Sequence, residues 1–245
     1  RVRRPAPLAR AVLLAAIALF ACGVATTLPD ADLGIRLAGA GLLAQAAWLA
    51  HYDVARRTIR MGGVTRYMAV ALLAAYWWLA VAGALWISAG ELPMAGSTYD
   101  AMVHTIFLGF AFSMVFAHAP VIVPAVLGVA LPYRRALYGP LVLLHAGLLL
   151  RLLGDWWGEL TIWQWGGVLD ETAILAFLVL AAWSAVSARR ARLGRVFFDR
   201  ARLAADRPAE QHRPAGGLAG NADGRRTAPD RGAGLRPIAV RAGVR

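Results

Sequence analysis

The feature that most limits the possible folds of this chain is a series of six long apolar runs. Hydrophobic residues make up 59% of its 245 residues, and the mean hydropathy is +0.56. A helix of about 20 apolar residues is long enough to cross a membrane. We therefore expect an all-α membrane protein, a bundle of six transmembrane helices. The predicted spans are residues 11–28, 34–51, 68–89, 101–120, 136–153 and 168–187.

The charges of the chain are unevenly distributed. The net charge is +12, and residues 189–245 alone hold fourteen arginines and five acidic residues. This last segment has no sustained apolar periodicity, which is typical of disorder. We therefore predict a transmembrane domain over residues 1–188 and a disordered, arginine-rich cytoplasmic tail over 189–245. The near-balance of charge in the first part argues against nucleic acid as a partner. The arginines of the tail are most simply topology signals and contacts to anionic membrane lipid.

Arginines also predict the orientation. They gather before the first span, in residues 52–67 and 132–135, and in the tail, whereas the acidic residues gather in the other loops. The positive-inside rule then places both termini in the cytoplasm of a multi-pass protein of the bacterial inner (plasma) membrane. The basic start is also typical of a cleaved signal peptide, but the length of the first run favours a retained helix. The single cysteine, Cys22, excludes an intrachain disulfide.

Four histidines lie in or at the end of the predicted spans. At 100° and 1.5 Å per residue, His104 and His118 share one helix face about 21 Å apart. The topology places His51 and His118 in the inner half and His145 near the middle. Arg151 approaches the depth of His104. Ionisable residues inside a membrane are functional-site candidates, so this ladder is the predicted site.

Two imidazoles from different helices at matching depth can bind haem iron as axial ligands. His145, with His51 as the alternative, is the predicted partner of His118. His104 has no histidine at its own depth and is the weaker or open-coordination ligand. Arg151 could pair with a haem propionate, because a guanidinium binds carboxylates through a two-pronged contact. The predicted cofactor is haem b, and copper is a further possible metal for His104, His118 and His145.

Simpler roles for these residues stay open. The role of His104 could be limited to a hydrogen bond with Tyr99 or Asp100. Arg151 could pair with Asp155, four residues later in the chain. The histidines would then relay protons or stabilise the bundle in a non-haem transporter or an assembly subunit.

Three stretches are expected to interrupt or begin helices. The prolines at 120, 124 and 132 predict a kink or a break after the fourth span. The segment GDWWGELTIWQWGG, with four tryptophans, predicts a loop at the membrane interface. Asp170 and Glu171 then suit the N-terminus of the sixth span.

The run HTIFLGFAFSMVFAHAPVIVPAVLG, followed by LLHAGLLLRLLGD, resembles the NnrS family and related haem-copper-type membrane proteins. The resemblance covers about residues 100–155. It implies haem and copper binding and a role in nitric oxide metabolism, with His104, His118 and His145 at the positions that inherit the ligand role. Members of that family have more spans, so this chain would be a half-sized relative or one component of a dimer.

The sequence thus predicts a membrane haem-binding protein, with copper as a further possibility. Its function would be electron transfer, haem or metal handling, or nitric oxide- or oxygen-related respiratory metabolism. A second copy of the chain or a respiratory-complex subunit is the expected protein partner. No arrangement typical of hydrolytic enzymes is found, and an enzymatic activity is left open.

Overall fold

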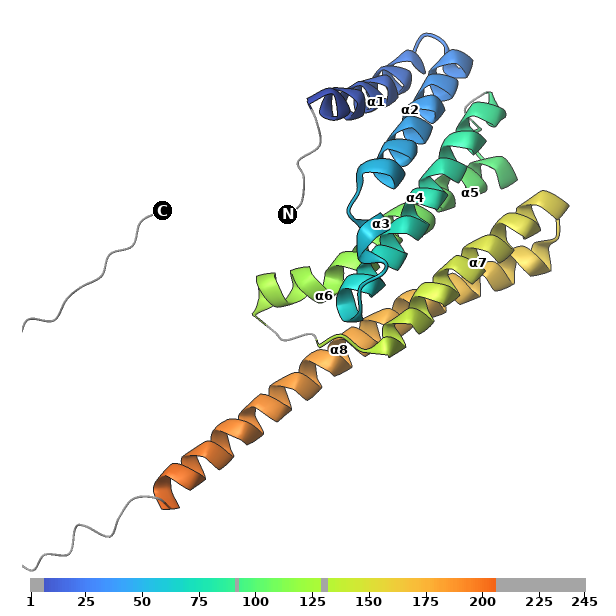
Figure 1. The fold of residues 1–245 in the computed structure, drawn as a ribbon. Helices are drawn as coiled ribbons and strands as arrows, with labels where there is room; N and C mark the ends of the chain where they lie inside the picture. The colour runs from blue at the N-terminus through green and yellow to red at the C-terminus, as the bar shows by residue number, and fades with distance from the viewer. Residues whose placement is uncertain (1–6, 91–92, 129–131, 206–245) are drawn as a thin grey trace, which may run out of the picture. The chain divides into compact units, whose positions relative to one another are not determined.

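The computed structural model describes residues 7–90, 93–128 and 132–205, and every regular element in these ranges is a helix (Figure 1). Six helices are long and apolar enough to cross a membrane, so the all-helical character and the number of candidate spans are confirmed. They are α1 (Pro7–Thr26), α2 (Ala31–Tyr52), α4 (Gly63–Ala89), the continuous helix α5 (Ser97–His104), η1 (Thr105–Phe112) and α6 (Ser113–Leu127), then α7 (Tyr138–Trp157) and α8 (Leu160–Ala205). Two short elements, α3 (Ala55–Thr58) and η2 (Arg135–Leu137), lie in connections.

The chain divides into one unit of residues 1–200 and a second of residues 201–245. Of the second unit, the structure describes only residues 201–205, the end of α8. The predicted disordered tail is therefore wrong for residues 189–205, which are helical. Residues 206–245 lie outside the described residues.

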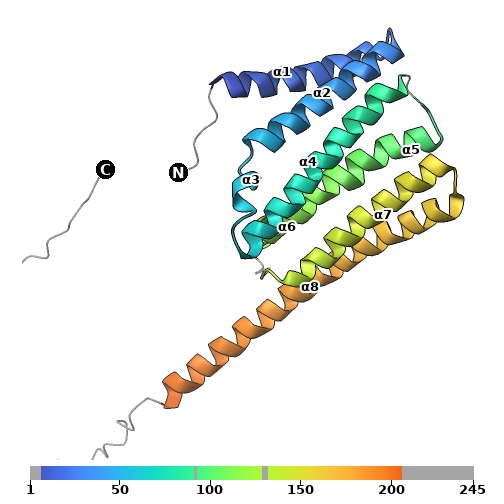
Figure 2. The same cartoon turned by 45° about the vertical axis from the view of Figure 1, so that its right-hand side comes forward.

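Neighbouring helices pack largely in chain order. α1 packs on α2, α2 on α4, α4 on η1 and α6, and α5 on α7 (Figure 2). Small residues allow these contacts: a Cβ on Gly39 would lie 2.8 Å from the carbonyl oxygen of Gly83. Gln45 donates to the Ala16 carbonyl across the α1–α2 contact at 3.5 Å.

The main apolar core lies where α4, η1, α6, α7 and α8 meet. The rings of Phe116 on α6 and Phe177 on α8 stack with centroids 3.9 Å apart. Around them lie the buried side chains of Leu141, Leu144 and Leu148 from α7. This core holds α7 and α8 against the helix that carries His104 and His118.

The fourth predicted span differs from a regular α-helix in two ways. Residues 105–112 are π-helical, and the helix runs through Pro120 and Pro124 to Leu127. The helix is therefore not broken at Pro120 or Pro124, it ends before Pro132, and the kink stays a prediction. The helix also begins at Ser97, a turn earlier than predicted, which brings Asp100 into it.

The tryptophan-rich segment is helical, and the predicted interface loop is wrong. α7 ends at Trp157 and α8 begins at Leu160, so only Gly158 and Glu159 connect them. Gly158 has φ +69°, a left-handed conformation that glycine adopts without steric cost, and this permits the tight reversal. Asp170 and Glu171 consequently lie well inside α8 and not at its N-terminus.

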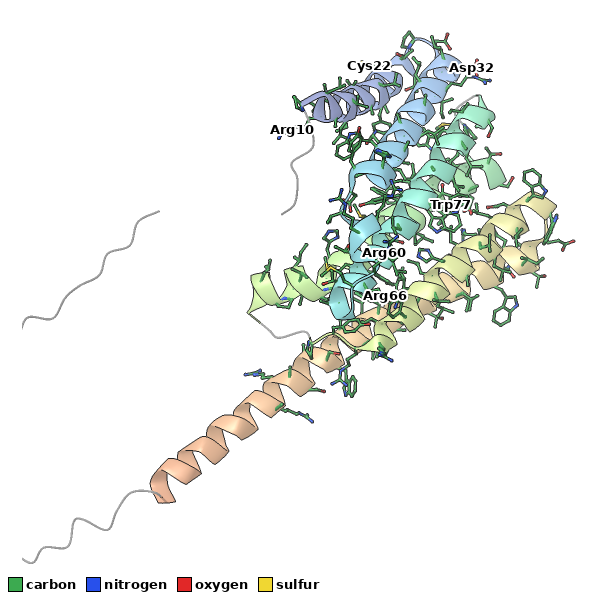
Figure 3. The ribbon with its side chains drawn as sticks, in the orientation of Figure 1. Arg10, Cys22, Asp32, Arg60, Arg66 and Trp77 are labelled. Atoms are coloured by element: carbon green, nitrogen blue, oxygen red, sulfur yellow. The ribbon has the colours of Figure 1, made fainter. Side chains whose placement is uncertain are left out.

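The two ends of the bundle differ in charge as predicted. Figure 3 shows Asp32 near the α1–α2 turn, while Arg60 and Arg66 lie at the opposite end of α2 and α4. Asp32 accepts a hydrogen bond from Arg36 at 2.9 Å, which neutralises the one arginine near that turn.

Candidate functional site

His104 and His118 have the same local arrangement. In each, Nδ1 lies 2.8 Å from the carbonyl oxygen four residues earlier, that of Asp100 and Met114 respectively. A carbonyl only accepts hydrogen bonds, so Nδ1 carries the proton and a neutral ring keeps its lone pair on Nε2. His104 Nδ1 also lies 3.2 Å from the Asp100 carboxylate, so the contact between these two residues that the sequence suggested is confirmed.

The π-helical segment changes the relation between the two histidines. It lies between them, and a π-helix closes its hydrogen bonds at i→i+5, with more residues per turn than an α-helix. Fourteen α-helical residues at 100° each turn the chain through 1400°, which is 40° short of four full turns. Each π-helical residue turns the chain by less than 100°, so the two side chains point further apart than this 40°. The inference that His104 and His118 share one helix face is therefore wrong.

His145 is held in the opposite tautomer. The indole Nε1 of Trp78 on α4 donates to His145 Nδ1 at 3.0 Å, and the two rings are nearly parallel. Because the indole only donates, Nδ1 must accept, and the proton of a neutral ring sits on Nε2. His145 Nε2 is buried and has no hydrogen-bond partner among the described residues. This tautomer does not present a lone pair for a metal at Nε2.

His51 ends α2 on the surface of the described unit, with its ring 4.7 Å from that of Tyr52. Within the described ranges, no group of three His, Cys, Asp or Glu side chains is placed to hold a metal ion. The predicted pairing of His118 with His145 or His51 stays a prediction.

A buried ionic cluster joins α5, α7 and α8 at the acidic end of the bundle. Arg151 on α7 donates to both carboxylate oxygens of Asp100 on α5, from Nε at 2.7 Å and from Nη2 at 2.8 Å. Trp163 on α8 donates to Asp100 at 3.1 Å, and its ring lies under the guanidinium, 4.2 Å from Cζ to the centroid. Arg151 therefore pairs with Asp100, and the suggested pairing with Asp155 is not what the structure contains.

Glycines on α7 and α8 make room for this cluster. A Cβ on Gly166 would lie 2.6 Å from the backbone nitrogen of Arg151, and one on Gly167 would lie 3.0 Å from its Nη1. A Cβ on Gly154 would lie 2.5 Å from the backbone nitrogen of Trp163. The side chains that bind Asp100 are thus positioned by helix backbones in close contact.

Asp155 lies beside the cluster and lines two cavities. Its Oδ2 is buried and has no hydrogen-bond partner among the described residues. One cavity, of about 480 Å³, is also lined by Asp100, Glu159 and Trp163 at the α7–α8 turn. The other, of about 580 Å³, lies between α4, α5 and α7 and is mostly apolar. The acidic cavity thus reaches the Asp100 carboxylate from the end of the bundle.

Sequence reasoning missed Asp170, which is only 3% exposed. It lies opposite Gly147 of α7, where a Cβ would be 2.5 Å from Asp170 Oδ1. Neither of its carboxyl oxygens has a hydrogen-bond partner among the described residues. A helical reading of the tryptophan-rich segment could have found it, since Trp163, Gly167 and Asp170 follow the i, i+4, i+7 spacing of one helix face.

The fold and the site define an all-helical protein with six helices of membrane-spanning length and buried ionic residues between them. The family model described as "Domain of unknown function (DUF8744)" matches residues 1–186, and the chain belongs to this family. No curated protein and no solved structure matches the chain. The function proposed below is therefore inferred mainly from the geometry of the histidines and of the ionic cluster.

Proposed function

We propose that this chain is a multi-pass protein of the bacterial inner membrane that binds haem b through His118 and His104. Six helices of sufficient length and hydropathy support membrane insertion. The separation of arginines and acidic residues between the two ends supports cytoplasmic termini. The resemblance of residues 100–155 to the NnrS family supports haem as the ligand class.

The observation that carries the proposal is the tautomer of the two histidines. Metal-binding histidines almost always donate their other ring N–H to a carbonyl or a carboxylate, which fixes the ring and raises the basicity of the binding nitrogen. His118 has this bond to the Met114 carbonyl, and His104 has it to Asp100. Both rings therefore have Nε2 free to bind iron as a neutral imidazole.

The same test removes two residues from the ligand set. His145 offers an N–H at Nε2 as long as Trp78 donates to Nδ1, so it does not fit as an axial ligand. Arg151 already forms a two-pronged contact with Asp100 and is not available to a propionate. Copper is left out of the proposal, since its sites need several protein ligands close together.

Each haem would receive one histidine from this chain, because His104 and His118 lie at different depths. The other axial position would be filled by a second copy, by a respiratory-complex subunit, or by a small diatomic ligand. Haem held in this way supplies one-electron or gas-binding chemistry, whose potential the axial ligand tunes. Electron transfer or the sensing of nitric oxide or oxygen is the proposed role.

The test is the absorption spectrum of the full chain purified in detergent from haem-supplied cells. We expect a Soret band and sharp reduced α and β bands. His118→Ala should remove most of the haem, and His104→Ala should lower the haem-to-protein ratio. His145→Ala should keep the haem. The matched control is His51→Ala, which alters an exposed histidine at a helix end.

A folded but colourless protein would overturn the proposal and favour the non-haem transporter or assembly subunit. Equal haem content in His118→Ala, His104→Ala and His51→Ala would show that bound haem uses other ligands. Folding of each variant is checked by its elution as a single species in size-exclusion chromatography.

A further inference from the structure

Asp170 is a carboxyl group placed deep in the helix bundle without a hydrogen-bond partner. It lies ten residues after Leu160, about 15 Å along α8 from the acidic end, near the middle of a membrane-spanning length. It is 3% exposed, and both oxygens lack a partner among the described residues. A buried carboxylate needs a cation or hydrogen bonds, and otherwise holds a proton.

The surroundings of Asp170 do not supply a cation of its own. Arg151, on the packed helix α7, lies against Gly166 and Gly167, one helical turn before Asp170. Its Nε and Nη2 bind the two oxygens of Asp100. Among the described residues, neither Asp155 nor Asp170 forms an ion pair.

Asp155 is a second carboxyl group without a cation of its own. It lines the same cavity as Asp100, and its Oδ2 is buried without a hydrogen-bond partner in the described part of the chain. Arg151 binds both carboxylate oxygens of Asp100 and forms no ion pair with Asp155. A buried carboxyl group without a cation or hydrogen bonds holds a proton.

The acidic cavity connects Asp100 and Asp155 to the end of the bundle. It has a volume of about 480 Å³ and is lined by Asp100, Asp155 and Glu159. A water molecule in it can pass a proton to a carboxylate oxygen and leave as hydroxide, or hydronium can leave as water. Arg151 lies next to the pair, with its Nη1 over Gly167, one helical turn before Asp170.

We propose that Asp155 and Asp170 are proton-binding residues of an inward path that starts at the acidic cavity and ends in the middle of the bundle. Asp155 holds an exchangeable proton at the mouth, and Asp170 holds a second proton deeper inside. Arg151, between them, stabilises either carboxyl when its proton has left. The proposal goes beyond haem binding and does not depend on it.

The test is infrared spectroscopy of the full chain in lipid at neutral pH, in H₂O and D₂O. We expect carbonyl bands of protonated carboxyl groups that shift on ¹³C labelling of aspartate. Asp170→Asn should remove one band and Asp155→Asn another. The band of Asp155 should exchange with D₂O sooner than that of Asp170. Asp32→Asn, which alters an exposed carboxylate paired with Arg36, should remove none.

Wild-type protein without a protonated aspartate band would overturn the proposal, even if a variant failed to fold. An Asp170→Asn protein that retains every band would overturn the assignment of the inner proton. Haem content has no bearing on either outcome, so the two proposals can fail separately.

Discussion

Two helix contacts in this protein use glycine in the same way but bring different groups together. Between α2 and α4, the space beside Gly39 is occupied by the Gly83 carbonyl, and a Cβ on Gly83 would meet the backbone of Leu43. Between α7 and α8, the space beside Gly147 is occupied by the carboxyl of Asp170, and that beside Gly167 by the guanidinium of Arg151. Beside Gly39 and Gly83 the nearest atoms are backbone atoms and the apolar side chain of Ile87, whereas beside Gly147 and Gly167 they include ionisable side chains.

The difference indicates what each contact is for. Close backbone approach through small residues is the usual way to associate membrane helices, and it needs no polar group. Placing Arg151 and Asp170 in such a contact costs desolvation, which packing alone does not require. Ionisable groups buried between helices are therefore a feature of the place where α7, α8 and α5 meet.

The largest expected effect comes from Arg151→Met. This change leaves Asp100 buried without its guanidinium, and removing one member of a buried pair costs about 3–5 kcal/mol. The measurement is the free energy of unfolding in mixed detergent micelles. Arg36→Met is the matched control, because that pair with Asp32 is half-exposed and should be worth about 1 kcal/mol or less.

The double variant Arg151→Met with Asp100→Asn sharpens this result. It removes the orphaned charge as well, so it should regain part of the stability lost in Arg151→Met. If Arg151→Met and Arg36→Met lowered the free energy of unfolding equally, the Asp100–Arg151 pair would stabilise the fold no more than the exposed Asp32–Arg36 pair does.

The next effect is expected from Gly166→Ala. The added Cβ would meet the Arg151 backbone nitrogen at 2.6 Å, so α7 and α8 must separate, with a loss of about 1–3 kcal/mol typical of overpacking. Gly139→Ala, elsewhere on α7, meets nothing within 4 Å and should gain up to about 1 kcal/mol of helix propensity.

Gly39→Ala provides the comparison with the other contact. It should also lower the free energy of unfolding, but it should leave the ¹⁵N signal of the Trp163 indole N–H, which bonds Asp100, unchanged. Gly166→Ala should change both. A Gly166→Ala protein that is as stable as Gly139→Ala would contradict the close approach of α7 and α8.

The sequence predicts the helices better than it predicts the site. Apolar length alone identifies the six helices that are long enough to cross a membrane. The Asp100–Arg151 pair joins residues 51 positions apart, and no local pattern could choose Asp100 over the nearer Asp155. Such a choice is made by tertiary packing.

Two errors have physical causes that can be named. The density of tryptophans predicts an interface loop, whereas the segment is helical on both sides of a two-residue turn. A loop there would place Asp170 at the start of a helix, but it lies well inside α8. The π-helical segment has no sequence cue of its own. It lies where Gly109 packs against Trp78, with a built Cβ only 2.6 Å from the Trp78 Cβ, so its geometry depends on a neighbouring helix.

The smallest expected effect is that of Trp78→Phe, which keeps an aromatic ring but removes the donor to His145. A single hydrogen bond of this kind is worth about 1 kcal/mol, so the free energy of unfolding should fall by roughly that amount. The more specific readout is the ¹⁵N spectrum of His145. Once Nδ1 has lost its donor, the Nε2–H tautomer is no longer imposed, and the ring nitrogens should shift toward a mixture of tautomers.

Trp77→Phe is the matched control, because the neighbouring side chain points outward and is 67% exposed (Figure 3). It should leave the His145 spectrum as it is. If Trp78→Phe also left that spectrum unchanged, the indole would not determine the tautomer, and His145 would return to the haem ligand set. His145 is a donor at Nε2, whereas His118 is an acceptor there. This difference depends on the indole N–H of Trp78.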